Sequence, residues 1–221
     1  MPSERSCWQR PAPVRSGGCD VAITADTLRN AAFRARDAAA AAQDDLNAAD
    51  GKIGDGDTGV MLRRLFDAVA TAIPNEETDV GLVFRACAKA CASGTGSSLG
   101  TLVTVAMMTL AKTTMGRDEI GWDELGGLLA SIRDQMMTRG GAGIGDKTVV
   151  DMLDAVAIAL AHCKTRDEAI AAAQKAARET LDAFRERPNR LGRARMFGER
   201  TIGLDDPGML AFSRLLAAVA A

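Results

Sequence analysis

Three aspartates lie close together in the segment ADGKIGDGDTG, directly ahead of an apolar helical pattern. Its glycines allow backbone conformations that other residues avoid, so Asp50, Asp55 and Asp57 can converge. Converging carboxylates repel one another, and the loop offers only Lys52 as a basic partner. A divalent cation removes that repulsion, and Mg²⁺ prefers carboxylate oxygens. The segment predicts a magnesium site, and a helix cap followed by a solvated turn is the alternative.

Two other kinds of site that use a D-x-D pattern do not fit this segment. A calcium-binding EF-hand that began at Asp55 would need Glu at its twelfth position, where Phe66 stands. A phosphatase of the haloacid-dehalogenase type would need a buried β-strand before the motif, and LNAADGKI does not have that pattern.

A second polar segment, CASGTGSSLGTL, precedes another helical pattern. Gly94, Gly96 and Gly100 alternate there with Thr95, Ser97 and Ser98. Exposed backbone N–H groups and hydroxyls at a helix start are suited to binding phosphate. The segment is neither a Walker A loop nor a dinucleotide fingerprint. Close packing between helices is the alternative explanation for its glycines.

Two more polar segments follow. In TRGGAGIGDKTVVD, Asp146 is expected to cap the next helix. The segment RERPNRLGRARMFGERTIGLDDPG contains six arginines. Guanidinium groups bind phosphate in bidentate fashion, so these arginines suit a loop that folds over a polyphosphate. A solvated surface and a nucleic-acid patch are the alternatives.

The composition limits the class of protein. The chain has 221 residues, 27 basic and 29 acidic side chains, and no tyrosine. The charge balance argues against nucleic-acid or anionic-membrane binding as a general role. No apolar run reaches the roughly 20 residues of a membrane helix. Five cysteines form no recognisable disulfide or zinc pattern, so we expect buried, reduced thiols and a cytoplasmic location.

Helical periodicity covers most of the chain and predicts an all-α fold without strands. Residues 1–22 lack periodicity and are expected to be a flexible tail, and residues 23–221 one domain. Eight helices are expected: about Ala25–Ala48, Thr58–Ile73, Asp79–Ala92, from the SGTGSSLG segment to Thr114, Trp122–Thr138, from GDKTVVD to Cys163, Arg166–Arg187 and Pro207–Ala220. The four polar segments all fall between these helices.

These four segments, in this order, resemble the nucleotide-binding L subunit of dihydroxyacetone kinases. The matching motifs are IGDGDTG, the glycine-rich loop ending in LGT, RG…GDKT, and GRA…GERTIG…DPG, from about Ala25 to the C-terminus. The resemblance implies a barrel of eight antiparallel amphipathic helices with the nucleotide at one end. It also implies that Asp50, Asp55 and Asp57 hold two Mg²⁺ ions against the phosphates of bound ADP or ATP.

The same resemblance implies nucleotide contacts elsewhere in the chain. Thr58 stands where members of the family often carry His or Cys. The implied nucleotide-binding residues are Thr58, Gly59, Met61, Gly94, Thr95, Gly140, Val149, Arg193, Asp206, Pro207 and Gly208. Gly140 and Val149 belong to the adenine pocket of the family, and no residue is expected to act as a general base.

The implied activity is phosphoryl transfer to dihydroxyacetone or a related small ketose that a separate K subunit holds. Two donors are open: ADP rephosphorylated by a protein of the phosphoenolpyruvate phosphotransferase system, or ATP that binds and leaves as ADP. Three alternatives remain. They are the nucleotide domain of a kinase that also carries a fatty-acid-transferring region, a regulatory module that binds nucleotide without turnover, and a plain helical scaffold.

Overall fold

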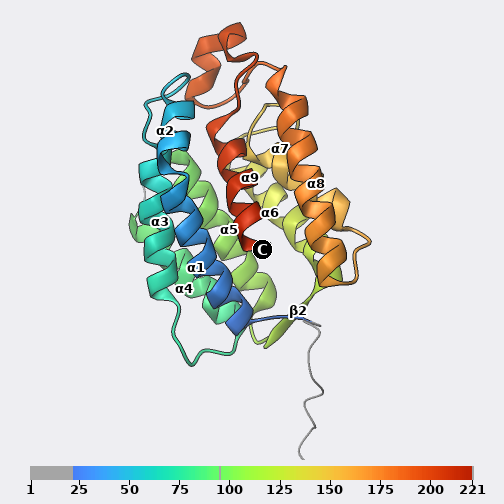
Figure 1. Ribbon diagram of the computed structural model, residues 1–221. Helices are drawn as coiled ribbons and strands as arrows, with labels where there is room; N and C mark the ends of the chain where they lie inside the picture. Colours follow the sequence, from blue (N-terminus) through green and yellow to red (C-terminus); the bar gives the residue numbers. More distant parts are fainter. Residues whose placement is uncertain (1–21, 95, 221) are drawn as a thin grey trace, which may run out of the picture.

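The computed structural model describes residues 22–94 and 96–220, and within them the fold is all-α (Figure 1). The expected tail, residues 1–22, falls almost wholly outside the described residues. The elements are β1 Ala22–Thr24, α1 Ala25–Ala41, α2 Gln43–Asp50, α3 Thr58–Ala72, α4 Val80–Gly94, α5 Ser98–Thr114, β2 Glu119–Gly121, η1 Trp122–Glu124, α6 Leu125–Gly140, α7 Val149–Leu160, α8 Arg166–Arg185, η2 Arg193–Thr201 and α9 Pro207–Val219.

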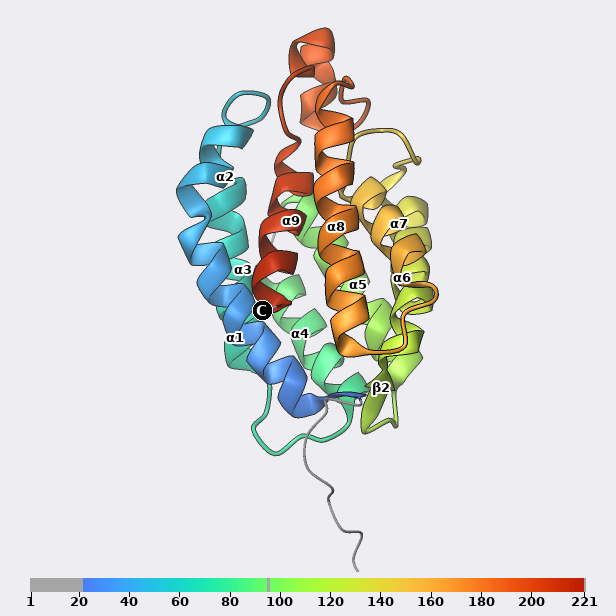
Figure 2. The same ribbon diagram turned by 45° about the vertical axis from the view of Figure 1, so that its right-hand side comes forward.

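The long helices pack in a closed order around the molecule. Each of α3 to α8 packs against the next helix of the chain, and α1 packs against both α9 and α3. Figures 1 and 2 show neighbouring helices running in alternate directions. This alternation brings the starts of α3, α5, α7 and α9 to one end of the molecule, which we call the site end.

Short sequence signals set the helix boundaries. Pro74 follows the end of α3, and Pro188 follows the end of α8. Thr165 caps α8 in a capping box with Glu168, which satisfies free N–H groups of the first turn. Seven of the eight predicted helices are confirmed in order and approximate extent, and the first is the exception.

The core is built from alanine and medium-sized apolar side chains. Leu65 and Val69 of α3 pack against Val83 and Cys87 of α4. Burial raises the pKa of Cys87 to about 12, so this thiol stays protonated. Cys91 is also buried in this cluster, which confirms the expectation of buried thiols for this pair.

Three features differ from the sequence-based expectation. The first predicted helix is two helices, which join at Ala42 beside the close approach of Gly59 to α2. The expectation of no strand is wrong, because β1 and β2 pair antiparallel with Ile23 opposite Ile120. Strands of three residues are too short to show alternation in the sequence. A 3₁₀ segment, η2, was also not expected.

Candidate functional site

The acidic loop joins α2 to α3 at the site end, and the side chain of Asp50 holds the loop by hydrogen bonds to its backbone. Asp50 is 8% exposed, and its Oδ2 accepts hydrogen bonds from the backbone N–H groups of Gly56, Asp57 and Thr58 at 2.9, 3.0 and 3.3 Å. These N–H groups lie at the start of α3, where backbone N–H groups have no acceptor within the helix. A carboxylate suits the partial positive charge there.

Asn47 of α2 completes the cap of α3. Its Oδ1 accepts from the N–H groups of Gly59 and Val60 at 2.8 and 3.2 Å. Asp57 occupies the N-cap position, where an aspartate usually accepts these bonds itself, yet its side chain makes no capping bond. Because side chains of α2 cap α3, the carboxylate of Asp57 is left for another partner.

The three aspartates of the loop converge. One carboxylate oxygen from each of Asp50, Asp55 and Asp57 lies within 4.8 Å of the other two, and Asp55 and Asp57 are exposed. A Cβ on Gly54 would lie 2.2 Å from Oδ1 of Asp50, so only glycine leaves room for this carboxylate. A cluster of hard oxygen donors with exposed members suits Mg²⁺, which keeps several waters.

Arg193 comes to this cluster from the other side of the site end. It is the first residue of η2, and its guanidinium forms an ion pair with Oδ2 of Asp55. The Arg193 side chain is 65% exposed. The pair therefore joins Asp55, an implied metal ligand, to Arg193, an implied nucleotide-binding residue that lies 138 positions later in the sequence.

The other implied contacts of α3 are placed differently. Gly59 is buried, and a Cβ there would lie 2.0 Å from the backbone oxygen of Gln43. Its N–H is already bonded to Asn47, so in this structure Gly59 serves the contact between α2 and α3. Met61 packs into the apolar cluster that contains Leu62. Thr58, at the start of α3, is half-buried.

The glycine-rich loop between α4 and α5 borders open space. A Cβ on Gly94 or Gly96 would meet nothing within 4 Å, which argues against close helix packing as the reason for these glycines. Thr95 lies outside the described residues. The side chain of Ser97 caps α5 by accepting from the N–H of Gly100 at 3.0 Å.

Residues from three helix starts meet beside this loop. A Cβ on Gly208 would lie 3.8 Å from Leu99 of α5 and 3.9 Å from Val149 of α7. Pro207 is buried at the first turn of α9. A Cβ on Gly140, at the end of α6, would lie 3.2 Å from Leu102 of α5. The starts of α5, α7 and α9 thus bring their partial positive charges together, as an anion site requires.

Asp206 caps α9, with Oδ1 accepting from the N–H of Met209 at 3.0 Å. Its Oδ2 accepts from Nδ2 of Asn189 at 2.8 Å. Burial raises the pKa of Asp206 to about 6, although these hydrogen bonds oppose the shift. Its role in this structure is to fix the start of α9.

Asp146 does not cap α7 as expected. It accepts from the N–H of Gly143 at 2.7 Å within the α6–α7 loop. The cap is Thr148, which forms a capping box with Asp151. Two residues have structural roles that the sequence did not predict: Asn47 was not singled out, and Lys147 was part of the motif RG…GDKT without a role of its own.

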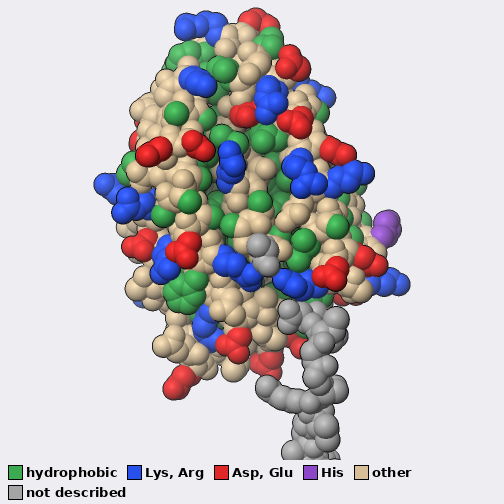
Figure 3. All heavy atoms as spheres, viewed as in Figure 1, with side chains coloured by type: hydrophobic (Ala, Val, Ile, Leu, Met, Phe, Trp, Pro, Cys, Tyr) green, Lys and Arg blue, Asp and Glu red, His purple; other side chains and the backbone are tan. Residues whose placement is uncertain are grey.

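The charges at the site end are mixed. Figure 3 shows Lys and Arg side chains beside Asp and Glu side chains over this end of the visible face. His162 follows α7 at the opposite end. None of the helices in the described ranges combines the length and hydrophobicity that a membrane crossing needs.

Comparison with known proteins gives relatives among kinases of small ketoses. The L-erythrulose 1-kinase of Mycolicibacterium smegmatis is 40% identical over 90 residues, which are 39% of this chain and 15% of that protein. The ADP-binding subunit DhaL of the PEP-dependent dihydroxyacetone kinase of Escherichia coli is 26% identical over 168 residues, 74% of this chain and 80% of the subunit. The chain thus spans a small part of the first relative and most of the second.

The fold also occurs in a solved kinase. The native dihydroxyacetone kinase of C. freundii matches 99% of this chain and 38% of its own chain, with a TM-score of 0.70 and 21% identity. Its complex with AMP-PNP and Mg²⁺ matches with a TM-score of 0.65. A family model described as DAK2 domain covers residues 52–221. The chain therefore belongs to the DAK2 domain family.

Proposed function

We propose that this chain binds an adenine nucleotide with Mg²⁺ at the site end and serves as the nucleotide-binding half of a ketose kinase. The observation that carries this proposal is the convergence of Asp50, Asp55 and Asp57 opposite Arg193. The solved relative in complex with AMP-PNP and Mg²⁺, and the relative named an ADP-binding subunit, support the choice of nucleotide.

The residues divide the work by position. Asp50 fixes the loop, while the exposed Asp55 and Asp57 present oxygens that would hold Mg²⁺, two ions by resemblance to the family. Bound Mg²⁺ would neutralise charge on the phosphates. The helix starts around Gly208 and the open glycine loop at Gly94 would face the remaining phosphate oxygens.

The phosphoryl acceptor would be dihydroxyacetone or a related small ketose held by a separate K subunit. Among the described residues, the site end offers carboxylates, arginines and backbone N–H groups but no histidine. The relatives leave both donors open, because one is named PEP-dependent and another is an erythrulose kinase. A phosphotransferase-system protein would be a second partner only if ADP stays bound.

The first experiment measures retained nucleotide. Purified protein is dialysed extensively against magnesium buffer and heat-denatured, and the supernatant is assayed for adenine nucleotide. Near-stoichiometric ADP would favour a retained cofactor and a protein donor. Empty protein that binds added ATP with Mg²⁺ would favour an exchanging, ATP-dependent kinase. Protein that binds neither nucleotide would contradict the proposal.

A variant pair tests the metal site. Asp55→Asn with Asp57→Asn should abolish magnesium-dependent nucleotide binding and leave the circular dichroism spectrum unchanged. Asp118→Asn is the matched control, because Asp118 is an exposed aspartate beside β2 at the opposite end. Unchanged binding in the double variant would refute the metal assignment.

Turnover separates a kinase subunit from a regulatory module. The chain should phosphorylate a ketose only when a K subunit is added. Efficient phosphorylation of free ketose by this chain alone would contradict the need for that partner. Nucleotide binding without turnover, even with a competent K subunit, would favour the regulatory module.

A further inference from the structure

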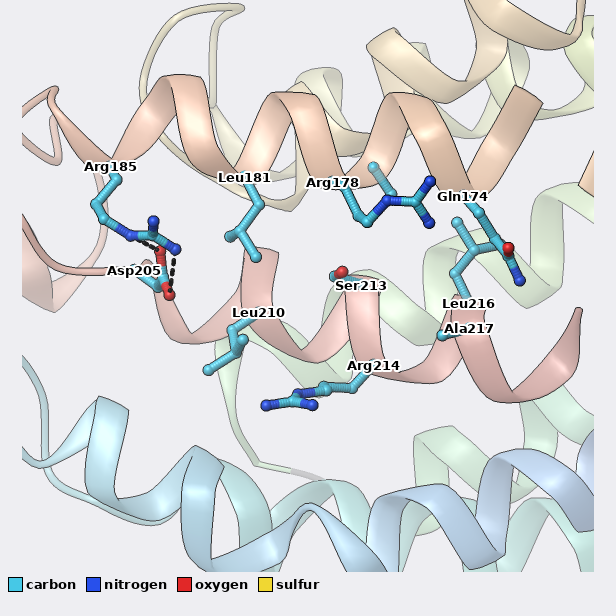
Figure 4. A pocket seen from close by; sticks show the side chains of 11 residues that line it. Gln174, Arg178, Leu181, Arg185, Asp205, Leu210, Ser213, Arg214, Leu216 and Ala217 are labelled. Carbon is cyan, nitrogen blue, oxygen red and sulfur yellow. Dashed lines mark hydrogen bonds and ion pairs between the residues drawn. The ribbon is translucent and has the colours of Figure 1, made fainter. Parts of the chain in front are cut away.

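Residues 186–205, which we call the cap segment, connect α8 to α9 and carry Arg193 to the acidic loop. The segment is closed at its base by Arg185 at the end of α8. The guanidinium of Arg185 donates to both carboxylate oxygens of Asp205 at 2.8 and 3.1 Å (Figure 4), and its carbonyl accepts from the N–H of Gly203 at 2.9 Å. Arg185 thus holds the C-terminal part of the cap segment, Gly203 and Asp205, against the end of α8.

The interior of the cap segment is held by a side chain from outside it. Lys147, in the α6–α7 loop, is fully buried. Its Nζ donates to the carbonyl oxygens of Arg185, Arg187 and Thr201 at 3.3, 2.7 and 2.9 Å. An ammonium group has three N–H donors, so these carbonyls use all of them. One side chain therefore joins the end of α8 to the end of η2.

Burial of the Lys147 ammonium and the backbone conformation of Lys147 both cost free energy, which the contacts of this residue must offset. Burial lowers the pKa of Lys147, and the nearby carboxylates of Asp206, Asp205 and Glu186 oppose that shift. The backbone of Lys147 is also left-handed, with φ of 63°, where a side chain is disfavoured. Positions of this kind are maintained where the surrounding contacts determine them, and they cluster at functional sites.

A second layer of hydrogen bonds repeats the same connection through Asn189. The carbonyl oxygen of Lys147 accepts from Nδ2 of Asn189 at 3.1 Å, and Nδ2 also donates to Asp206. The N–H of Asn189 donates to Oγ1 of Thr201 at 2.8 Å. The buried network thus links the α6–α7 loop, both arms of the cap segment and the start of α9.

The network ends close to the proposed site. η2 is kinked at Gly198, so Thr201 at its end does not by itself fix Arg193 at its start. The arm that leads to Arg193 is held closer to that residue, because Lys147 binds the carbonyl oxygen of Arg187 and the N–H of Arg190 donates to the carbonyl oxygen of Asp146 at 3.0 Å. Arg193 itself is mostly exposed, and its guanidinium pairs with Asp55. The position of its guanidinium therefore depends on how firmly the α6–α7 loop holds residues 187–190.

We propose that Lys147 is a positioning residue: by joining the α6–α7 loop to both arms of the cap segment, it places Arg193 against the nucleotide phosphates. The inference rests on the proposed function in one respect, namely that the ligand contacted by Arg193 is a nucleotide. Lys147 does not touch that ligand. It affects nucleotide binding only through Arg193.

A double-mutant cycle tests this coupling. Arg193→Ala and Lys147→Met are compared singly and together for binding of ADP with Mg²⁺ by calorimetry. Losing one charge-assisted contact should weaken binding about tenfold in each single variant. The double variant should bind no more weakly than Arg193→Ala alone, because Lys147 acts only through Arg193. Losses that multiply would overturn the proposal, as would unchanged binding in folded Lys147→Met.

Controls separate positioning from general loss of stability. Lys175→Met is the matched control, since Lys175 is an exposed lysine on α8 that pairs with Glu179 on the same helix. It should bind as the unaltered protein does. If Lys147→Met does not fold, Lys147→Gln takes its place in the cycle, because it removes the ammonium charge and keeps two N–H donors for the same carbonyl oxygens.

A ligand-free measurement keeps this test distinct from that of the proposed function. Hydrogen exchange should accelerate in residues 186–205 of Lys147→Met, or of Lys147→Gln, and stay unchanged in α1 to α4. If the unaltered protein binds no nucleotide, the proposed function fails, and exchange alone then decides whether Lys147 holds the cap segment. Acceleration throughout the chain, or none in the cap segment, would overturn the positioning role.

Discussion

Asp50 should contribute to stability as well as to metal binding, in contrast to Asp57. Asp50→Ala removes the acceptor for three backbone N–H groups at the start of α3. Leaving a buried donor unpaired costs about 1–3 kcal/mol. Gly56 and Thr58 are half-buried and Asp57 is exposed, so water replaces part of what is lost. We expect Asp50→Ala to lower the free energy of unfolding by about 2–4 kcal/mol.

The assay is urea unfolding followed by circular dichroism, without and with Mg²⁺. With a slope of about 2 kcal/mol per molar urea, the midpoint of Asp50→Ala should fall by about 1–2 M. Asp57→Ala is the matched control, because its carboxylate makes no capping bond. Its stability without Mg²⁺ should change by at most about 0.5 kcal/mol.

Added Mg²⁺ separates the two roles. It should stabilise the unaltered protein by about 2.7 kcal/mol at one hundred times its dissociation constant. Both variants should lose this gain, since each lacks one of the converging carboxylates. Equal destabilisation of Asp50→Ala and Asp57→Ala in metal-free buffer would refute the reasoning that side chains of α2, and not Asp57, cap α3.

Three further predictions concern other positions. Gly59→Ala should lower the free energy of unfolding by about 1–3 kcal/mol, because the new Cβ meets the backbone of α2. Gly94→Ala, whose Cβ faces open space, should change the free energy of unfolding by at most about 0.5 kcal/mol. Equal effects of the two substitutions in urea unfolding would contradict this prediction. Arg193→Ala should tighten Mg²⁺ binding without nucleotide by up to about fivefold, since Asp55 loses a competing partner; calorimetry showing weaker binding would exclude such competition. The raised pKa of Asp206 means that the folded state holds its proton up to about pH 6, so its contribution to stability is present below the unfolded pKa and is lost as the pH rises through about 6. Asp206→Asn should remove this loss of stability when the free energy of unfolding is measured from pH 4 to 7. An unchanged pH profile in the variant would mean that another group causes the loss.

The helices and the acidic cluster could be predicted because their signals are local. Proline and capping residues mark the helix ends, and Asp50, Asp55 and Asp57 are close in sequence. The family resemblance then placed Arg193 at the same site, which the sequence spacing alone would not do. The expected nucleotide role of Gly59 could not be weighed against packing, because the backbone of Gln43 reaches Gly59 only once α2 and α3 are folded.

The remaining features depend on contacts between distant residues. The three carbonyls that surround Nζ of Lys147 come from residues 38 to 54 positions away, so no sequence window contains the network. A lysine in a loop ordinarily suggests an exposed charge. The pairing of β1 with β2 likewise joins segments too short to carry a periodic pattern.

The alternation of helix direction also has a consequence for chain topology. The connections that build the site, α2–α3, α4–α5, α6–α7 and α8–α9, all lie at the site end, and α3–α4, α5–α6 and α7–α8 lie at the other (Figure 1). The first described strand lies at that other end, and α9 runs towards it. A circular permutant, cut in the α7–α8 connection and rejoined across the original ends, should therefore keep every site connection covalently intact.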